Sequence, residues 1–542
     1  MYARSDNGRL FRSPLLWGAL GIGIALRSVG LFQQIMVGDE TFAFRFARKT
    51  AFPGVLWAYE WGANSPAFNA WLRLFLELGV TPSELALRIP VLASGIALLV
   101  VVPWWMSRQL GNHVAVAVAW LLALSPVMVV YSRFMRPYMP LALLGTVAAG
   151  AFYDWWRTGR RAAGVTYALA AAGAVYVNLL GTPFVLAPFV FLALEAGLHG
   201  RATLPPRREV VVVAGLLGAV LLVLVVPAWS DLLELLEIHD KPAELGVRSV
   251  RAVVLLMSGT GTPLLALALW AAVVVGGVRL ARLRPDLLRF LLVICVADIV
   301  AVPILASNGI AHPVLLCRYL IVIMVPILTL AALGLTAAAP VRLALAPLLL
   351  AAIGLSGPLV DLNLYRNPLG LKHKFFRYDL RDEPPSRLAP PEPYRILATG
   401  PPGAVVECAF PLLFNFLEPL ADYWEVHRRP IQVVPILDHL NDPRLGLRST
   451  AADQPQPLLD GDAAFVVVHR DWREEVGVER IPGSLSPRAG QFVERDLAAM
   501  RREADRLTEQ LERSWGAPDV RDDAVAIWDL TRVRARQGEN HR

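Results

Sequence analysis

The chain has 542 residues, of which 55% are hydrophobic and 18% are charged, with a formal net charge of +7 at pH 7. This composition, with a mean hydropathy of +0.49, excludes an ordinary soluble globular protein and indicates a polytopic membrane protein. The basic excess does not indicate a nucleic acid partner, because the arginines recur in short clusters between apolar runs and form no continuous face. The three cysteines are too few and too scattered for a disulfide framework.

Apolar runs of about 20 residues predict membrane-spanning helices, and we count about eleven of them. The predicted spans lie near residues 14–34, 86–106, 113–131, 138–156, 164–180, 182–199, 209–229, 262–279, 288–306, 317–337 and 341–360. The first run follows several arginines but has no small-residue cleavage site. We therefore expect it to be retained as a span and not removed as a signal peptide.

Arginine-rich loops alternate with other loops along the chain, and this alternation predicts the sidedness of the spans. The loops predicted to be cytoplasmic contain Arg108, Arg157, Arg201, the pair Arg279 and Arg284, and Arg342. An odd number of spans then places residues 35–85, the loop near 230–260 and the whole C-terminal part outside the cell membrane. The prediction is a multi-pass protein of the cell (inner) membrane with a cytoplasmic N-terminus.

A change in composition after Pro358 predicts a second domain. The expected organisation is a membrane domain at residues 1–360, a proline-rich linker at 361–390 and an extracytoplasmic domain at 391–542. Strand-like runs and one amphipathic helix predict a small α/β or α+β fold for the last domain. The runs are residues 404–410, 431–437, 463–469 and 524–530, and the helix is 492–515. The predicted fold class is mostly α, a polytopic helix bundle of about 11 spans with this small domain added.

The loop between the first two spans, residues 35–85, carries the most suggestive polar pair. Asp39 and Glu40 are adjacent carboxylates directly after the first span. Apolar residues at helical spacing later in this loop predict short helices on the membrane surface. The loop near 230–260 has a similar pattern and includes Lys241, so the two loops are expected to wall a cavity.

Arginines also occur where the alternation predicts outer ends of spans. Residues 131–138 include Arg133, Arg136 and Tyr138, and Arg318 with Tyr319 begins the tenth span. These positions break the bias that keeps arginine on the cytoplasmic side, which indicates an anion on the outer side. A lipid phosphate suits the planar guanidinium fork, whose stem can lie in apolar surroundings.

These segments resemble the lipid-linked sugar transferases of the GT-C class. The other segments that carry the resemblance are Asn64-Ser65-Pro66, Leu87-Arg88-Ile89-Pro90, Pro401 to Glu407 and His427-Arg428-Arg429-Pro430. The resemblance covers most of the chain and is to the protein O-mannosyltransferase and lipid A aminoarabinose transferase group (glycosyltransferase family 39-like). It implies inverting transfer of a sugar from a polyprenyl-phosphate donor to a hydroxyl of a lipid, glycan or protein acceptor, with Asp39 as the general base.

The predicted site combines these residues. Its catalytic candidates are Asp39 and Glu40, and its donor phosphate ligands are Arg136, Arg318, Tyr138 and Tyr319. The candidate substrate contacts are Asn64, Arg133, Asn178 and Lys241. Relatives often have histidine at or beside the positions of Asn64 and Asn178, so the resemblance does not identify the sugar or the acceptor. A phosphate leaving group needs no general acid when cations stabilise it, so no cofactor is expected, and Mg²⁺ or Mn²⁺ is a minor alternative.

Structural alternatives remain for the candidate residues. Asp39 could cap a helix, and the arginines could hold loop carboxylates or phospholipid headgroups. Arg27 and Asp298 lie inside predicted spans, where structural pairing is preferred to catalysis.

Two other classes of function also remain open, a transporter or flippase of a lipid-linked anionic substrate and a non-catalytic membrane scaffold. The transferase is preferred because the polar groups gather at the ends of spans, no internal repeat is found, and a scaffold needs fewer spans.

Overall fold

The computed structural model describes two compact units of the chain. The residues it describes are 10–28, 31, 43, 46–47, 50–59, 65–78, 84–200, 204–231, 247–260, 263–306, 313–337, 392–409, 427, 429, 431–435, 459, 463–470, 501–502, 504–523 and 525–540. Those up to residue 337 belong to the first unit, and those from residue 392 belong to the second.

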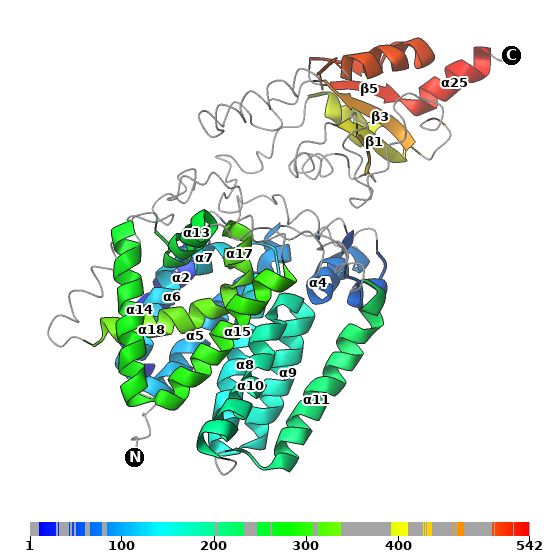
Figure 1. Cartoon of the computed structure of the whole chain (residues 1–542). Helices are drawn as coiled ribbons and strands as arrows, with labels where there is room; N and C mark the ends of the chain where they lie inside the picture. Colours follow the sequence, from blue (N-terminus) through cyan, green and yellow to red (C-terminus); the bar gives the residue numbers. More distant parts are fainter. Residues whose placement is uncertain are drawn as a thin grey trace. The chain divides into compact units, whose positions relative to one another are not determined.

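The first unit is a helix bundle (Figure 1). Its helices in chain order are α2 (Pro14–Ser28), η1 (Gly54–Leu56), α4 (Pro66–Glu77), α5 (Glu84–Leu110), α6 (Asn112–Leu124), α7 (Pro126–Tyr131), α8 (Tyr138–Thr158), α9 (Arg161–Val177), η2 (Leu179–Gly181), α10 (Thr182–His199), α11 (Arg207–Val225), η4 (Val226–Ala228), α13 (Val247–Ser258), α14 (Pro263–Leu283), α15 (Pro285–Leu305), α17 (Pro313–Tyr319), η5 (Ile321–Ile323) and α18 (Met324–Leu335). The first ten predicted spans coincide with helices of this unit, which confirms the predicted bundle. The eleventh, near 341–360, lies outside the described residues.

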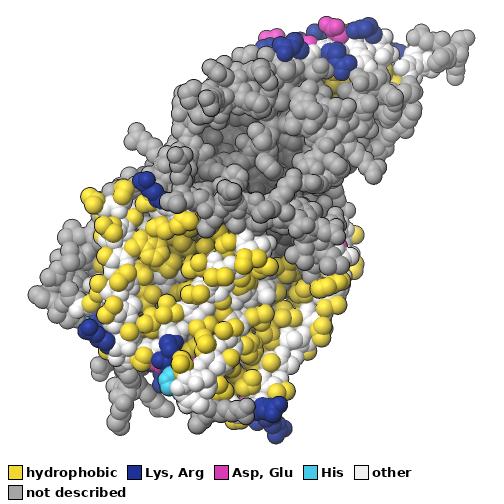
Figure 2. Space-filling model, in the orientation of Figure 1, with side chains coloured by type: hydrophobic (Ala, Val, Ile, Leu, Met, Phe, Trp, Pro, Cys, Tyr) yellow, Lys and Arg dark blue, Asp and Glu magenta, His cyan; other side chains and the backbone are white. Residues whose placement is uncertain are grey.

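The surface of this unit is that of a membrane protein. Among the described residues, five helices are long and apolar enough to cross a membrane: Leu85–Leu110, Leu179–His199, Arg207–Asp231, Pro263–Leu283 and Pro285–Leu305. Figure 2 shows that hydrophobic side chains cover most of the bundle on this face, and that the arginines lie towards its ends. Leucine side chains such as Leu264 and Leu267 are largely exposed, as expected of helices that face lipid. The protein is therefore a multi-pass membrane protein.

The predicted span 113–131 is divided into two helices at Ser125. Pro126 has no N–H to donate to the carbonyl of Leu122, and α6 ends at Leu124. The Ser125 side chain accepts a hydrogen bond of 3.5 Å from the N–H of Met128 and thereby caps α7. Helix α7 is therefore a short segment that leads into the turn before α8.

The helix bundle has two ends. The site end holds α7, α13, α17 and the start of α8, and the opposite end holds the end of α8 and the start of α9 (Figure 1).

Helices α14 and α18 pack backbone against backbone. A Cβ atom at Gly276 would lie 1.8 Å from the carbonyl oxygen of Leu330, and one at Gly334 would lie 1.9 Å from that of Ala272. Helices in lipid gain little from burying apolar surface against each other, so such close approach between small residues is a main source of their association.

The second unit contains a five-stranded sheet of order β2-β1-β3-β5-β4. Its strands are β1 (Ala404–Ala409), β2 (Ile431–Pro435), β3 (Ala463–His469), β4 (Val520–Arg521) and β5 (Val525–Asp529). Strand β1 runs parallel to β2 and β3, whereas β5 is antiparallel to β3 and β4. The helical elements of this unit include η7 (Glu392–Tyr394), α20 (Arg395–Thr399), residues 504–515 and α25 (Leu530–Asn540).

The core of the second unit lies between the sheet and its helices. Val466, Val468 and Trp528 from the sheet are buried in one cluster with Leu507 and Leu511. The structure thus confirms a small mixed domain after the membrane bundle, with the predicted strands in place. Strand β4 and helix α25 were not predicted from the sequence.

Candidate functional site

Three arginines are buried at the site end of the bundle. The exposed fractions of Arg133, Arg136 and Arg318 are 0%, 4% and 5%. The guanidinium carbon of Arg318 lies 5.1 Å from the centre of the Tyr138 ring and 5.3 Å from that of Tyr319. Because Tyr138 begins α8 and Arg136 precedes it by two residues, the structure brings Arg136 and Arg318 into one region. The two sequence segments predicted to share a site therefore meet.

Aromatic rings surround the Arg318 side chain. The rings of Tyr138 and Tyr319 are 6.3 Å apart, and Tyr131 packs edge-on against Tyr138 at 5.5 Å. A guanidinium over such rings is attracted by their negative faces, and the attraction increases when water is excluded. This arrangement holds a cation in a largely apolar environment, where it interacts strongly with an anion.

The turn before α8 is fixed by its own backbone and by α2. The N–H of Arg133 donates to the carbonyl of Val130 at 3.0 Å, and the N–H of Arg136 donates to that of Phe134 at 2.6 Å. The guanidinium of Arg133 also donates to the carbonyl of Leu26 at 3.5 Å. The N-cap residue of α8, Pro137, has no side-chain group that could cap the first turn, and this N-terminus carries a partial positive charge. The cationic character of this end comes from both side chains and backbone.

Arg27 is the buried support of this turn. Its guanidinium donates to the carbonyls of Leu122 and Ala123 at 3.1 and 3.5 Å, to that of Gly23 at 2.9 Å, and to the hydroxyl of Ser132 at 3.0 Å. The Leu122 carbonyl lacks a helical partner because residue 126 is proline, so Arg27 supplies the missing donor. Arg27 therefore joins α2, the end of α6 and the start of the arginine-bearing turn, which is a structural role.

Helix α5 approaches this support through Gly95. A Cβ atom at this position would lie 2.0 Å from the Ser132 hydroxyl oxygen and 3.4 Å from Nε of Arg27. The Ser132 hydroxyl itself donates to the carbonyl of Met128 at 2.5 Å. Only a glycine allows α5 to lie this close to the hydrogen-bonded pair of Arg27 and Ser132.

The described part of the first loop is tied to the ends of α9 and α11. The Ser65 hydroxyl donates to the carbonyl of Val177 at 2.6 Å, and the Tyr176 hydroxyl donates to that of Leu56 at 2.7 Å. The N–H of Tyr59 donates to a carboxylate oxygen of Asp231 at 3.0 Å. Burial of the Tyr59 side chain raises the pKa of its hydroxyl. These bonds hold this loop against the bundle.

Helix α13 lies in the loop near 230–260, which is the second loop predicted to wall the cavity. This amphipathic helix packs against α17, and Gly259, which follows it, approaches the start of α7. A Cβ atom at Gly259 would lie 2.4 Å from Cδ of Pro126, and its φ of +69° is one that glycine adopts readily. The end of this loop therefore lies beside the start of α7, the helix that leads into the arginine-bearing turn.

The remaining predicted residues have different outcomes. Asp39, Glu40, Asn64 and Lys241 lie outside the described residues. Asn178 is buried between α9 and η2, where its side-chain oxygen accepts a hydrogen bond of 3.0 Å from the N–H of Leu180. This cap fixes the end of α9, and it accounts for the amide oxygen without any substrate.

From the sequence, a metal ion is a minor alternative, and Asp298 is expected to pair structurally within its span. Within the described part of the chain, no group of three His, Cys, Asp or Glu side chains could hold a metal ion. Asp298 is fully buried in α15, and neither of its carboxylate oxygens has a hydrogen-bond partner among the described residues. The pairing expected for Asp298 is thus not found there.

The opposite end of the bundle holds a polar network that the sequence analysis did not anticipate. The Tyr153 hydroxyl donates to Asp286 at 2.5 Å and accepts a hydrogen bond of 2.7 Å from Arg284, which also bonds to Gln109. Arg284 was interpreted from the sequence as a loop arginine that sets sidedness, yet only 7% of its surface is exposed. Its burial could not be read from hydropathy because its partners come from three separate helices.

The chain was compared with protein families, with curated proteins and with solved structures. No family model and no curated protein matches the sequence. The structure is similar to that of ArnT from Cupriavidus metallidurans in the apo state, with a TM-score of 0.56, 15% identity and coverage of 94% of this chain and 97% of ArnT. ArnT bound to undecaprenyl phosphate matches with a TM-score of 0.54 and 17% identity, over 88% of this chain and 96% of ArnT.

A further match is the archaeal oligosaccharyltransferase AglB from Archaeoglobus fulgidus, with a TM-score of 0.49 and 14% identity, over 85% of this chain and 69% of AglB. At the identities of the ArnT matches, the likeness shows the fold. The likeness to ArnT extends over both units, and it confirms, at the level of the fold, the GT-C resemblance predicted from the sequence.

Proposed function

We propose that this protein is an integral membrane glycosyltransferase that moves a sugar from a polyprenyl-phosphate-linked donor to an acceptor hydroxyl. The observation that carries the proposal is the shared fold with ArnT over 94% of this chain, together with the undecaprenyl phosphate bound in one ArnT structure. The buried arginines at the site end supply the chemistry that such a donor requires. The proposed acceptor is a lipid, a glycan or a protein, and the sugar is a hexose or a pentose.

In this proposal the donor phosphate binds at Arg318 and Arg136. A guanidinium can donate two parallel hydrogen bonds to phosphate oxygens, and burial makes that interaction stronger than in water. The rings of Tyr138 and Tyr319 hold the Arg318 guanidinium between them. The same cations stabilise the charge that develops on the phosphate as it leaves, so the departure needs no general acid.

Asp39 is the proposed general base, and Glu40 is the second candidate. The base removes the proton of the acceptor hydroxyl as that oxygen attacks the anomeric carbon from the face opposite the phosphate, which inverts the configuration. Neither a metal ion nor another cofactor enters the proposed reaction. Adding a chelator to the assay tests whether transfer depends on Mg²⁺ or Mn²⁺ at the two carboxylates.

The proposal includes the orientation and the domains. Residues 1–360 form the catalytic membrane domain with a cytoplasmic N-terminus, residues 361–390 link the domains, and residues 391–542 are extracytoplasmic. A reporter fused after Arg208 should be cytoplasmic, and one fused after Asp361 should be extracytoplasmic. If the second reporter were cytoplasmic, the C-terminal domain and the proposed outer site would lie on opposite sides of the membrane, and this part of the proposal would be wrong.

The decisive experiment compares donor binding and single-turnover rate in purified variants. Asp39→Asn should keep donor affinity but slow transfer by about 10² to 10⁴, the usual contribution of a general base. Arg318→Ala should weaken donor binding and slow transfer, and Arg318→Lys should restore only part of each because an ammonium lacks the fork. Arg282→Gln, at an exposed position of the opposite end, is the charge-matched control.

Thermal unfolding of each variant checks its folding. If folded Asp39→Asn transferred sugar at the wild-type rate, the base would be another residue. If Arg318→Ala bound the donor as tightly as Arg282→Gln, the proposed phosphate site would be wrong.

A further inference from the structure

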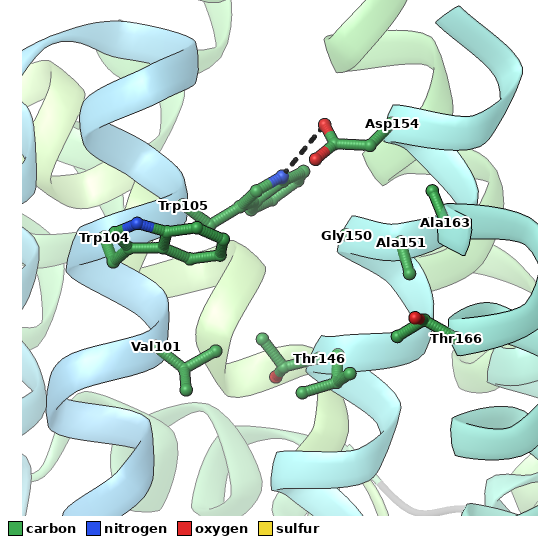
Figure 3. A pocket seen from close by; sticks show the side chains of 10 residues that line it. Val101, Trp104, Trp105, Thr146, Gly150, Ala151, Asp154, Ala163 and Thr166 are labelled. Carbon is green, nitrogen blue, oxygen red and sulfur yellow. Dashed lines mark hydrogen bonds between the residues drawn. The ribbon is translucent and has the colours of Figure 1, made fainter. Parts of the chain in front are cut away.

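An open groove lies on the bundle between α5, α8 and α9. Its volume is about 340 Å³. Figure 3 shows Val101, Trp104 and Trp105 on the α5 side, with Gly150 and Ala151 of α8 and Thr166 of α9 across from them. The groove is nearer the opposite end of the bundle than the proposed sugar transfer site, because Asp154 from the last turns of α8 also lines it.

The groove opens on the surface that faces lipid. Trp104 is 39% exposed, and large apolar side chains near it on both walls are also exposed, namely Val100 of α5 and Val165 and Leu169 of α9. Small residues form the floor between these walls: a Cβ atom at Gly150 would already lie 3.3 Å from the Trp105 ring. An elongated apolar chain from the bilayer can therefore lie in the groove.

One end of the groove is polar. The carboxylate of Asp154 accepts hydrogen bonds from the indole of Trp105 at 3.3 Å and from the amide of Gln109 at 3.0 Å. Arg108 donates to the same carboxylate at 3.3 Å and lies over the Trp104 ring at 5.1 Å. Asp154 thus has several donors, and it holds the Arg108 guanidinium next to the groove.

Among the described residues beside the groove, the cations exceed the anions available to them. Arg161 is paired with Glu209 at 2.9 Å, and Arg108 shares Asp154 with two neutral donors. Arg160 begins the turn into α9, is exposed, and has no side-chain partner among the residues that the structure describes. The guanidinium groups of Arg108 and Arg160 therefore have N–H donors left for a further anion.

We propose that this groove binds an anionic phospholipid, with one acyl chain between α5 and α9 and the phosphate at Arg108 and Arg160. Apolar contact alone cannot select a lipid, because an acyl chain loses as much contact with the bilayer as it gains from the groove. Selection must come from the headgroup, and each arginine near it favours an anionic lipid by roughly five-fold. Two arginines then favour an anionic over a zwitterionic lipid by roughly 30-fold.

The test is a competition between dioleoyl phosphatidylglycerol and dioleoyl phosphatidylcholine for the purified protein at limiting lipid, with bound lipid counted by native mass spectrometry. We expect the wild type to retain phosphatidylglycerol roughly 30-fold over phosphatidylcholine. Arg160→Gln should reduce this preference roughly five-fold, and the double variant Arg108→Gln/Arg160→Gln should remove it. Arg282→Gln deletes an exposed charge from the same end, away from the groove, and should keep the wild-type preference.

A second variant tests the groove separately from the charges. Ala151→Leu narrows the groove without changing any charge, and it should reduce retention of both lipids in protein that unfolds at the wild-type temperature. Equal retention of the two lipids by the wild type would overturn the proposal. Equal losses in Arg160→Gln and Arg282→Gln would also overturn it, because the preference would then reflect surface charge in general. If Ala151→Leu retained as much lipid as the wild type, the groove would be excluded as the lipid-binding site.

Discussion

Replacing Gly95 with alanine should destabilise the membrane bundle, although alanine is the better helix former. In the middle of a helix this change normally stabilises by about 1 kcal/mol. Here the new Cβ would lie 2.0 Å from the hydroxyl oxygen of Ser132 and 2.6 Å from its Cβ, which is closer than two such atoms can approach. Overpacking of this kind costs about 1–3 kcal/mol.

The displacement also breaks a hydrogen bond. The guanidinium of Arg27 donates to Ser132 at 3.0 Å, and such a bond contributes about 0.5–1.5 kcal/mol. Adding this loss to the overpacking and subtracting the helix gain gives a net destabilisation of about 2 kcal/mol. Because Ser132 begins the turn that carries Arg133 and Arg136, Gly95→Ala should also weaken donor binding if that turn holds the phosphate.

The assay is thermal unfolding in detergent, followed by tryptophan fluorescence at a fixed scan rate. Gly21→Ala is the matched control, because a Cβ atom at Gly21 of α2 would meet nothing within 4 Å. Gly95→Ala should unfold at a lower temperature than the wild type, and Gly21→Ala at an equal or higher one. Adding Ser132→Gly removes the clashing atoms, so Gly95→Ala should cost less in that background. If Gly95→Ala unfolded at or above the wild-type temperature, the close approach between α5 and Ser132 would be refuted.

Three other predictions use different parts of the molecule. Gly276→Ala should lower the unfolding temperature because its Cβ would meet a backbone carbonyl of α18, whereas Gly277→Ala, with nothing within 4 Å, should not; equal effects would contradict the α14–α18 packing. Burial raises the pKa of the Cys408 thiol to about 12, so a maleimide at pH 8 should label this thiol only after the second unit unfolds. Rapid labelling of Cys408 in the folded protein would contradict this prediction. Tyr153→Phe removes the hydroxyl bonded to Asp286 and should destabilise the bundle by about 1–3 kcal/mol. The same unfolding assay measures this, and an unchanged unfolding temperature would show that the hydrogen bonds of Tyr153 contribute little to stability.

The raised pKa of Cys408 makes the stability of the second unit depend on pH. The unfolded thiol ionises near pH 8.5, but the folded thiol stays neutral until about pH 12. Between these values the unfolded state binds fewer protons, so Cys408 lowers the stability of the second unit as the pH rises through this window.

Hydropathy and local pattern were sufficient for ten of the predicted membrane spans and for four of the five strands of the second unit. Ten predicted spans coincide with helices because the length of an apolar run and its flanking charges are properties of adjacent residues. The division between α6 and α7 follows from Pro126, which lacks a backbone N–H. Because successive spans cross the membrane in opposite directions, their order also predicts that residues 131–138 and Arg318 lie at the same end of the bundle.

The partners of the buried polar groups were decided by the tertiary structure. Arg27 donates hydrogen bonds to residues 95, 96 and 105 positions away, which no local pattern can indicate. Gly95 is an ordinary helix glycine in the sequence, and only the position of Ser132 makes it necessary. Arg284 had the pattern of a loop arginine, but Gln109 and Tyr153 from other helices enclose it. Hydropathy specifies that a helix lies in the membrane, whereas neighbouring helices and their rotation determine which polar groups meet.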